Sequence, residues 1–400
     1  MSASSSHDHF CLDPLERVEK HLSLRYIISA QEYKKGRASL ICDALSYGVG
    51  QITSSHGVRI VPCKEMVQAP ENLSYIIREG PVGGNMRYID IAVSDTIINF
   101  ETMGFSSLLS LIAGDIFGSP YFQDLLLLYD LKLPDTSNSI FAGPCFGSDG
   151  VISRLDRSRR KNVFLGLLLK PDVGVSEEYY IDIVEAAIQG GIDYIKEDEL
   201  TIDSEICPRF RRIEGVSKCI EKSKRNTLYA ANVTSPPHIA KDVCMKAIEC
   251  GATALLINGI QVGLDTVLYL AKSKQINVPI HFHRAGYDIL SSGQKAIHVS
   301  LLTRLFRLAG ADIVHVGSPL GGLFSQDTVK RNTTELKDSE YGIKSSLPVF
   351  SRSSSESLEF LLNSDEYSPP FIVLFDSEIY TSPKGIERSI KDIRKRMEQT

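Results

Sequence analysis

Several common signals are missing from this chain of 400 residues, and each absence excludes a class of protein. The eight cysteines form no Cys-x-x-Cys pair, which argues against a cysteine-based zinc site and for reduced thiols in a reducing compartment. No uninterrupted apolar run approaches the ~20 residues that a membrane-spanning helix needs. No Gly-x-Gly-x-x-Gly follows the first strand-like segment, so nothing specifically favours a dinucleotide-binding fold.

A strong charge of either sign is also missing. The formal net charge of −5 and the pI near 6.0 argue against nucleic acid as the main partner. Residues 1–13 are mostly polar and lack the apolar core of a signal peptide, so we expect a disordered tail there. These features predict a cytoplasmic protein that binds neither nucleic acid nor a membrane.

The remaining chain has two rhythms. Residues 14–140 combine strand-like segments, such as 22–29 and 86–93, with helical patterns at 32–45 and 106–117, which predicts an α+β domain of the ferredoxin-like kind. Residues 141–400 alternate short apolar runs with amphipathic stretches of helical length, which predicts a (β/α)8 TIM barrel. The expected barrel strands are 163–169, 194–196, 228–232, 254–258, 280–283, 313–316, 348–350 and 371–375.

Polar residues follow these expected strands, at the end of a barrel where active sites lie. One such residue alone would be an ordinary loop residue, but a set converging on one rim favours an active site. The set consists of Lys170, Lys196, Asp198, Glu199, Asn232, His283, Arg284, His315 and Ser351.

The most informative group in this set is Lys196, Asp198 and Glu199, which directly follow the second expected strand. Carboxylate oxygens bind a hard divalent cation, and a carbamylated lysine would add oxygen ligands of its own. Taken alone, the group is equally consistent with a solvated charged loop. Its position on the rim favours a metal site.

Four segments in this order resemble the large subunit of RuBisCO. Residues 166–176 resemble its first barrel strand and loop, and residues 190–199 resemble the second strand with its activating lysine. Residues 281–285 read His-Phe-His-Arg-Ala like the fifth strand, and residues 315–318 resemble the sixth. The likeness continues over most of the chain.

The resemblance implies a role for each rim residue. Lys196 would be carbamylated by CO2 and would bind Mg2+ with Asp198 and Glu199. Lys170 would move a proton at the enediolate, and His283 would transfer a second proton. Arg284 and His315 would bind a phosphate of the substrate, and Ser351 would contact the substrate's carbon chain. Asn232 would either contact the substrate or only order the rim. The family further implies a homodimer with an active site shared between chains, completed by Asp115 or its neighbours.

Departures from the family pattern point away from carbon fixation. Asp172 replaces the second lysine of the first loop, and Gly322 stands where the family has the lysine that reaches CO2. Asp376 and Glu378 occupy the place of a glycine-rich phosphate cradle, where negative charge would repel a second phosphate. The chain therefore resembles the non-carboxylating, form IV RuBisCO-like proteins.

The expected function is a Mg2+-dependent lyase or isomerase that forms an enediolate from a phosphorylated keto sugar or keto sugar acid, with decarboxylation favoured. The alternatives are an isomerase of the 2,3-diketo-5-methylthiopentyl-1-phosphate enolase type, a ribulose-bisphosphate carboxylase, and a non-catalytic binding protein. Carbamylation needs a neutral amine, so we expect burial to lower the pKa of Lys196. We expect pKa values near neutrality for Lys170 and His283.

Overall fold

A computed structural model describes residues 12–47, 73–137, 140–141, 143–155, 162–339 and 341–399, so most of the expected N-terminal tail lies outside the described residues. The chain divides into two compact units. Unit 1 comprises Met1–Phe141 and Gly286–Leu302, and unit 2 comprises Ala142–Ala285 and Thr303–Thr400.

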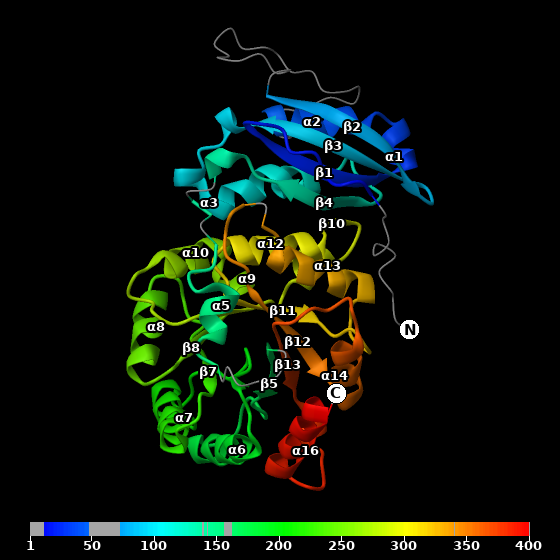
Figure 1. The fold of residues 1–400 in the computed structure, drawn as a ribbon. Coiled ribbons are helices and arrows are strands. Elements are labelled where there is room, and N and C mark those ends of the chain that lie inside the picture. The colour runs from blue at the N-terminus through cyan, green and yellow to red at the C-terminus, as the bar shows by residue number, and fades with distance from the viewer. Residues whose placement is uncertain are drawn as a thin grey trace. The chain divides into compact units, whose positions relative to one another are not determined.

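Unit 1 contains a five-stranded mixed sheet with the strand order β10-β4-β1-β3-β2 (Figure 1). The central strand β1 (His21–Ser29) pairs antiparallel with β3 (Met86–Ser94) and β4 (Leu126–Lys132). The edge strands are β2 (Ser74–Gly83) and β10 (Lys295–Ile297), the latter parallel to β4. The strand β10 therefore belongs to this sheet, although its residues were expected in the barrel domain.

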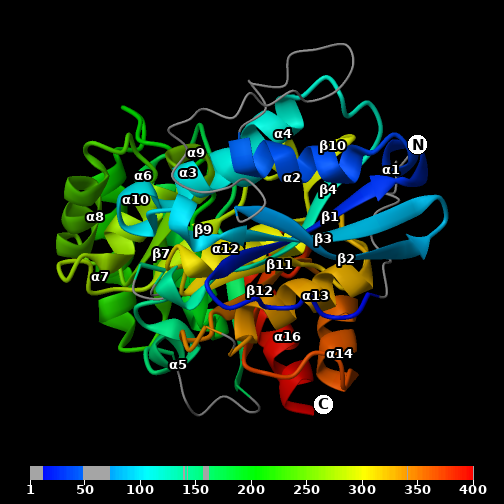
Figure 2. The same cartoon turned by 90° about the horizontal axis from the view of Figure 1, so that it is seen from above.

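Two helices, α1 (Ala30–Lys34) and α2 (Arg37–Tyr47), follow β1 where a single helix was expected. Gly36 separates them with a φ of +76°, a conformation that L residues rarely adopt. The helix α2 packs against β2 and β3 (Figure 2). Strands and helices together confirm the α+β class of unit 1.

A second helical stretch of unit 1 is the expected helix at 106–117. It begins earlier and consists of α3 (Phe100–Leu109), a π-helical turn (Ser110–Gly114) and α4 (Asp115–Gly118). By length and composition alone, this stretch of 19 residues could cross a membrane. Buried core helices of globular proteins also meet this criterion. Its buried side chains include Leu108 and Ile112, and the Ile112 carbonyl accepts a hydrogen bond of 2.6 Å from the Tyr26 hydroxyl on β1.

Unit 2 is a closed barrel of eight parallel strands in the order β11-β12-β13-β5-β6-β7-β8-β9, which confirms the TIM barrel. The strands are β5 (Val163–Leu168), β6 (Tyr194–Lys196), β7 (Leu228–Asn232), β8 (Ala254–Asn258), β9 (Ile280–His283), β11 (Ile313–Gly317), β12 (Leu347–Ser353) and β13 (Phe371–Phe375). All eight lie within a few residues of their expected positions.

Helices alternate with these strands, as the amphipathic stretches of the sequence predict. They are α5 (Gly147–Ile152), α6 (Glu177–Gly190), α7 (Arg209–Ser223), α8 (Ala240–Glu249), α9 (Gly259–Val262), α10 (Leu264–Lys272), α12 (Val299–Leu308), α13 (Gln326–Lys337), α14 (Ser355–Asn363), α15 (Ser377–Tyr380) and α16 (Ile386–Gln399). A further short helix, α11 (Asp288–Ser291), lies in unit 1.

The boundary between α6 and β6 shows how local sequence positions the site. The Ser176 hydroxyl accepts a hydrogen bond from the Tyr179 amide and caps the start of α6. Gly191 ends the helix with a φ of 93°, the left-handed conformation typical of a C-terminal cap. The chain then enters β6, so that Lys196 lies at the strand's carboxyl end.

Apolar side chains fill the barrel interior. Phe164, Leu256 and Val349 belong to one buried cluster, which Val151 and Leu155 near the amino end of the barrel also join. The interior is therefore a packed core, and polar groups are left to act at its ends. Replacing Leu256 by Ala would cost about 2–5 kcal/mol of stability.

Candidate active site

Lys196 is a deeply buried ionisable residue at the rim. Its side chain is 1% exposed, and its Nζ atom donates a hydrogen bond of 2.9 Å to the Glu197 carbonyl. Burial lowers the pKa of Lys196 to about 8, although the nearby carboxylates of Asp198 and Glu199 oppose this shift. The expected direction of the shift is confirmed, and a sizeable fraction of the amine is neutral near physiological pH.

Lys170 lies between two carboxylates. Its Nζ atom is 2.7 Å from Asp172 Oδ2 and 2.9 Å from Asp198 Oδ2. Burial alone would lower the pKa of Lys170, but the hydrogen bonds to both carboxylates outweigh it and raise the pKa above its ordinary value. The expectation of a near-neutral pKa is therefore wrong for this state, in which Lys170 is an ammonium group.

The carboxyl groups of Asp198 and Glu199 share a hydrogen bond, and their pKa values shift in opposite directions. Burial and this hydrogen bond raise the pKa of Glu199 to about 7. Burial would also raise the pKa of Asp198, but hydrogen bonds from Glu199 and Lys170 and the charge of Lys196 lower it. Two carboxyl groups that share a hydrogen bond bind one proton between them.

Three histidines form a neighbouring cluster. The ring of His315 lies 4.7 Å from that of His281 and 5.3 Å from that of His283, between centroids. Burial, reinforced by the charge of Lys196, holds the pKa of His281 and His283 well below 6.5, so the near-neutral value expected for His283 is also wrong. Burial likewise lowers the pKa of His315.

The hydrogen bonds of His283 indicate its tautomer. The Ala285 amide donates to Nδ1 at 3.2 Å, so the neutral ring carries its proton on Nε2. That Nε2 atom lies 3.2 Å from Glu199 Oε2. His283 therefore directs an N–H at the carboxyl group of Glu199.

Two further residues were predicted to contact the substrate. The Arg284 guanidinium stacks on the ring of Phe324, 4.5 Å from its centroid. Ser351 is half-buried near the end of β12, and within the described part of the chain no hydrogen bond joins it to Lys196. The side chain of Asp115 lies outside the described residues, so its shared-site role stays a prediction.

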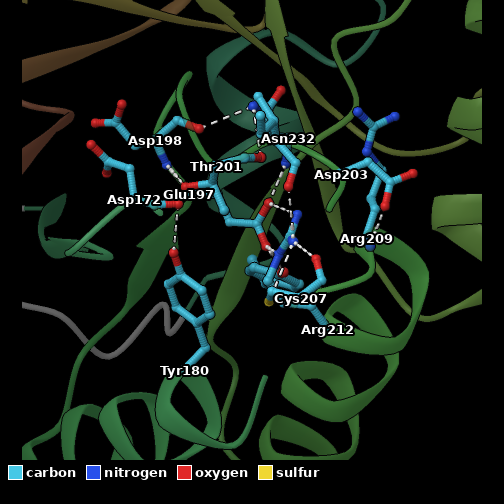
Figure 3. A network of polar contacts seen from close by, with 12 residues as sticks. Asp172, Tyr180, Glu197, Asp198, Thr201, Asp203, Cys207, Arg209, Arg212 and Asn232 are labelled. Carbon is cyan, nitrogen blue, oxygen red and sulfur yellow. Dashed lines mark hydrogen bonds and ion pairs between the residues drawn. The ribbon is translucent and has the colours of Figure 1, made fainter. Parts of the chain in front are cut away.

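A buried ion pair holds the loop that carries Asp198 and Glu199 (Figure 3). The Arg212 guanidinium donates to both Glu197 carboxylate oxygens, at 2.8 and 3.3 Å, and both side chains are 0% exposed. Tyr229 donates a third hydrogen bond to this carboxylate, and the Asn232 amide donates a fourth at 2.8 Å. In Figure 3, Glu197 points toward Arg212, whereas Asp198 points away from it.

Asn232 contributes a second anchor. Its side-chain amide donates to the carbonyls of Asp198, Glu199 and Thr201 at 3.0, 3.1 and 3.2 Å. The Thr234 amide donates to its oxygen at 3.0 Å. These contacts favour a role for Asn232 in ordering the rim over a role in substrate binding.

The sequence interpretation assigned no role to some residues of this network. Arg212 lies on α7, and nothing in its local sequence identifies a partner. Tyr380 accepts a hydrogen bond from the Lys170 amide and donates one to the Leu168 carbonyl, both at 3.0 Å. Glu197 could have been found, because a charged residue between two rim residues faces the opposite way.

Comparisons with known proteins show what the chain resembles in sequence. A family model of the ribulose bisphosphate carboxylase large chain, catalytic domain, matches residues 149–340. A 2,3-diketo-5-methylthiopentyl-1-phosphate enolase of Geobacillus kaustophilus is 34% identical over 232 residues, 56% of this chain and 56% of that protein. A ribulose bisphosphate carboxylase-like protein of Allochromatium vinosum is 32% identical over 250 residues, 61% of this chain and 54% of that one. The chain is therefore similar in sequence to the carboxylase large chain and to its RuBisCO-like relatives.

Solved structures show the same fold. A rubisco-like protein from Alicyclobacillus acidocaldarius has a TM-score of 0.78 at 23% identity, covering 96% of this chain and 94% of that chain. An archaeal RuBisCO has a TM-score of 0.81 at 20% identity, covering 96% and 92%. The sequence matches span little more than half the length of the Geobacillus and Allochromatium relatives.

The carboxyl groups of Asp198 and Glu199 fit a magnesium ion, and a modified Lys196 would add to them. Within the described ranges, no three His, Cys, Asp or Glu side chains are grouped to hold a metal ion. Asp198 and Glu199 supply two carboxyl groups, and a third anionic oxygen ligand could come from another group. A carbamate on the partly neutral amine of Lys196 would provide it.

The neighbouring sector of the rim, at β12 and β13, differs from this pattern. Glu378 Oε2 accepts a hydrogen bond of 2.7 Å from the amide of Ser355, the first residue of α14, and Oε1 accepts one from the Ser355 hydroxyl. Asp376 caps α15 by accepting from the Ser377 amide. The amino terminus of α14, which could otherwise bind an anion, thus holds a carboxylate of the protein itself.

Proposed function

We propose that this protein is a Mg2+-dependent enzyme of the enolase type, which forms an enediolate from a phosphorylated keto substrate. The observation that carries the proposal is the buried, partly neutral amine of Lys196 beside the paired carboxyl groups of Asp198 and Glu199. When bound, Mg2+ would act as a Lewis acid that favours loss of a proton next to a carbonyl group.

The residues around this group divide the remaining tasks. Lys170 would hold a proton on Nζ and stabilise negative charge as it develops on a substrate oxygen. His283, with its tautomer set by the Ala285 amide, would transfer a second proton through Nε2. Glu197 and Asn232 would keep the loop of Asp198 and Glu199 in place through contacts made on its far side.

A substrate with one phosphate group suits the rim. Arg284 and His315 lie next to His283 and would take that phosphate. The sector at α14 already contains Glu378, whose charge would repel a second phosphate. Ribulose-bisphosphate carboxylation is therefore the least supported reaction.

The relatives bear on the choice between an enolase and a decarboxylase. Several are named as 2,3-diketo-5-methylthiopentyl-1-phosphate enolases, which supports proton transfer on a diketo phosphate as the reaction. Decarboxylation, preferred from the sequence, stays an untested prediction, as do the cytoplasmic location and the homodimer with a shared site. We propose the enolase reaction as the first to test.

The test follows solvent deuterium into candidate keto phosphates by NMR, with Mg2+ and bicarbonate present. Exchange at the carbon beside the carbonyl without release of CO2 would support the enolase, and CO2 release would support the decarboxylase. Lys196→Ala should abolish either activity while the variant still folds. A substrate that binds but neither exchanges nor loses CO2 in the unaltered protein would instead support a non-catalytic binding protein.

A further inference from the structure

A cavity of about 600 Å3 opens at the amino end of the barrel, opposite the rim that carries Lys196. Its lining includes Ser346 and Pro370, which directly precede β12 and β13. The volume is within the range of about 300–1,000 Å3 that is typical of small-molecule sites.

Two buried charged residues hold the cavity walls in place. The Asp312 carboxylate accepts from the amides of Phe146 and Gly147 at 2.8 and 2.7 Å, and from that of Ile280 at 2.9 Å. The Arg307 guanidinium donates to the carbonyls of Ile343 and Lys344, each at 3.0 Å. Both side chains are 1% exposed, so the walls are fixed by contacts that do not need a ligand.

The cavity contains two ammonium groups whose hydrogen bonds end on neutral acceptors. Lys337 donates to the Ser368 carbonyl, and Lys344 donates to the Cys145 carbonyl. Among the described residues, no carboxylate forms an ion pair with either lysine. Burial alone lowers the pKa of Lys337, as expected for an ammonium group without an ion-pair partner.

A third donor is Ser148, which lines the same cavity. Its side chain is buried, and within the described part of the chain its hydroxyl has no hydrogen-bond partner. Buried polar atoms without partners are uncommon and often indicate a missing ligand or water. Asp149 also lines the cavity, so the lining carries two positive charges and one negative charge.

We propose that this cavity binds a small organic phosphate, with Lys337, Lys344 and Ser148 donating to the phosphate oxygens. Phe146 and the two prolines Pro369 and Pro370 provide an apolar wall for the organic part. Because the cavity and Lys196 lie at opposite ends of the barrel, the ligand contacts none of the reacting groups. It would instead tie together Lys337 and the segments 146–149, 343–346 and 368–370, and stabilise the barrel.

Calorimetric titration of the full chain with phenyl phosphate tests this site. Lys337→Met should weaken the binding by about tenfold or more, and Ser148→Ala by a smaller factor. Lys330→Met is the matched control, because Lys330 lies on the same helix α13, pairs with Glu366 at the surface and does not line the cavity. Lys344→Met, at an exposed position, is the second variant if Lys337→Met does not fold.

The active site could also bind phenyl phosphate, so Lys196→Met separates the two sites. The binding of phenyl phosphate that depends on Lys337 should persist in the Lys196→Met variant. Binding that is unaffected by the Lys337, Lys344 and Ser148 variants, or that is lost in Lys196→Met, would overturn the proposal. Benzoate should bind at least about tenfold more weakly than phenyl phosphate, and equal binding would overturn the assignment to phosphate.

Discussion

The two sectors of the barrel rim use carboxylates in opposite ways. At β5 and β6, the carboxyl groups of Asp198 and Glu199 lie close together and lack enough positive charge to satisfy both, so they would gain from a cation. At β12 and β13, the carboxylate of Glu378 is already satisfied by the amide and hydroxyl of Ser355. The sector at β5 and β6 would bind a cation, whereas Glu378 already occupies the anion-binding helix end in the sector at β12 and β13.

The largest expected effect tests the sector at β6. Asp198→Asn removes one charge from the carboxyl pair and should lower turnover of the accepted substrate by about 10³-fold. The measurement is kcat at saturating Mg2+ and bicarbonate. Asp203→Asn, in the same loop but hydrogen-bonded to the Arg209 amide, is the control. Equal losses in the two variants would mean that Asp198 has no special role.

The second prediction concerns the anchor behind that sector. Arg212→Met leaves the buried carboxylate of Glu197 without its partner and should cost about 3–5 kcal/mol of the free energy of unfolding. Denaturant titration measures this cost. Arg211→Met breaks the more exposed pair with Glu177, whose arginine is 70% exposed, and should change stability by less than about 1 kcal/mol.

Combining Arg212→Met with Glu197→Gln removes the orphaned charge. This double variant should recover part of the lost stability, because an uncharged amide costs less to bury than a carboxylate. No recovery would show that the guanidinium stabilises the loop mainly through its contacts to the carbonyls of Ile202 and Cys207.

The third prediction tests the closed sector. Glu378→Ala frees the amide of Ser355 and should raise the affinity for propane-1,3-diyl bisphosphate relative to propyl phosphate by about tenfold. Competitive inhibition of turnover measures both affinities. Glu359→Ala is the control for the change in net charge, because it removes an exposed charge from α14, the helix that begins at Ser355. An unchanged ratio in Glu378→Ala would show that Glu378 does not exclude a second phosphate.

The smallest expected effect is a dependence on pH. Burial lowers the pKa of Lys196 to about 8, so the neutral amine that reacts with CO2 is the minor form at pH 7 and the major form at pH 9. At fixed dissolved CO2, the rate of activation should therefore rise through pH 8 and level off above it. Activation that falls across this range would contradict carbamylation of Lys196.

Much of the fold could be predicted because each barrel strand is a short apolar run followed by a polar residue. The strand ends at Lys196, Asn232 and His283 could be predicted to the residue. The placement of β10 could not, because a strand of three residues has little periodicity and its pairing with β4 depends on distant sequence. The break at Gly36 was missed because the apolar pattern continues across it.

The site could be predicted in its residues but not in its charge states. Lys170 was expected to have a near-neutral pKa, and the structure raises that pKa because Asp172 and Asp198 both contact its ammonium group. The sequence shows that both carboxylates are present, but it does not show how close they lie to the Lys170 Nζ atom. The role of Glu378 needed the structure for the same reason, since Ser355 is 23 residues away along the chain.

The position of Glu197 between Lys196 and Asp198 has a consequence for how this loop can change. Neighbouring residues in extended chain face opposite sides, so an insertion or deletion of one residue here would exchange inner and outer side chains. The anchoring carboxylate would turn outward, and a neighbour would have to face Arg212. Substitutions at Asp198 can alter the chemistry while the backbone stays in place, whereas a change of length at this point would cost both the chemistry and its support.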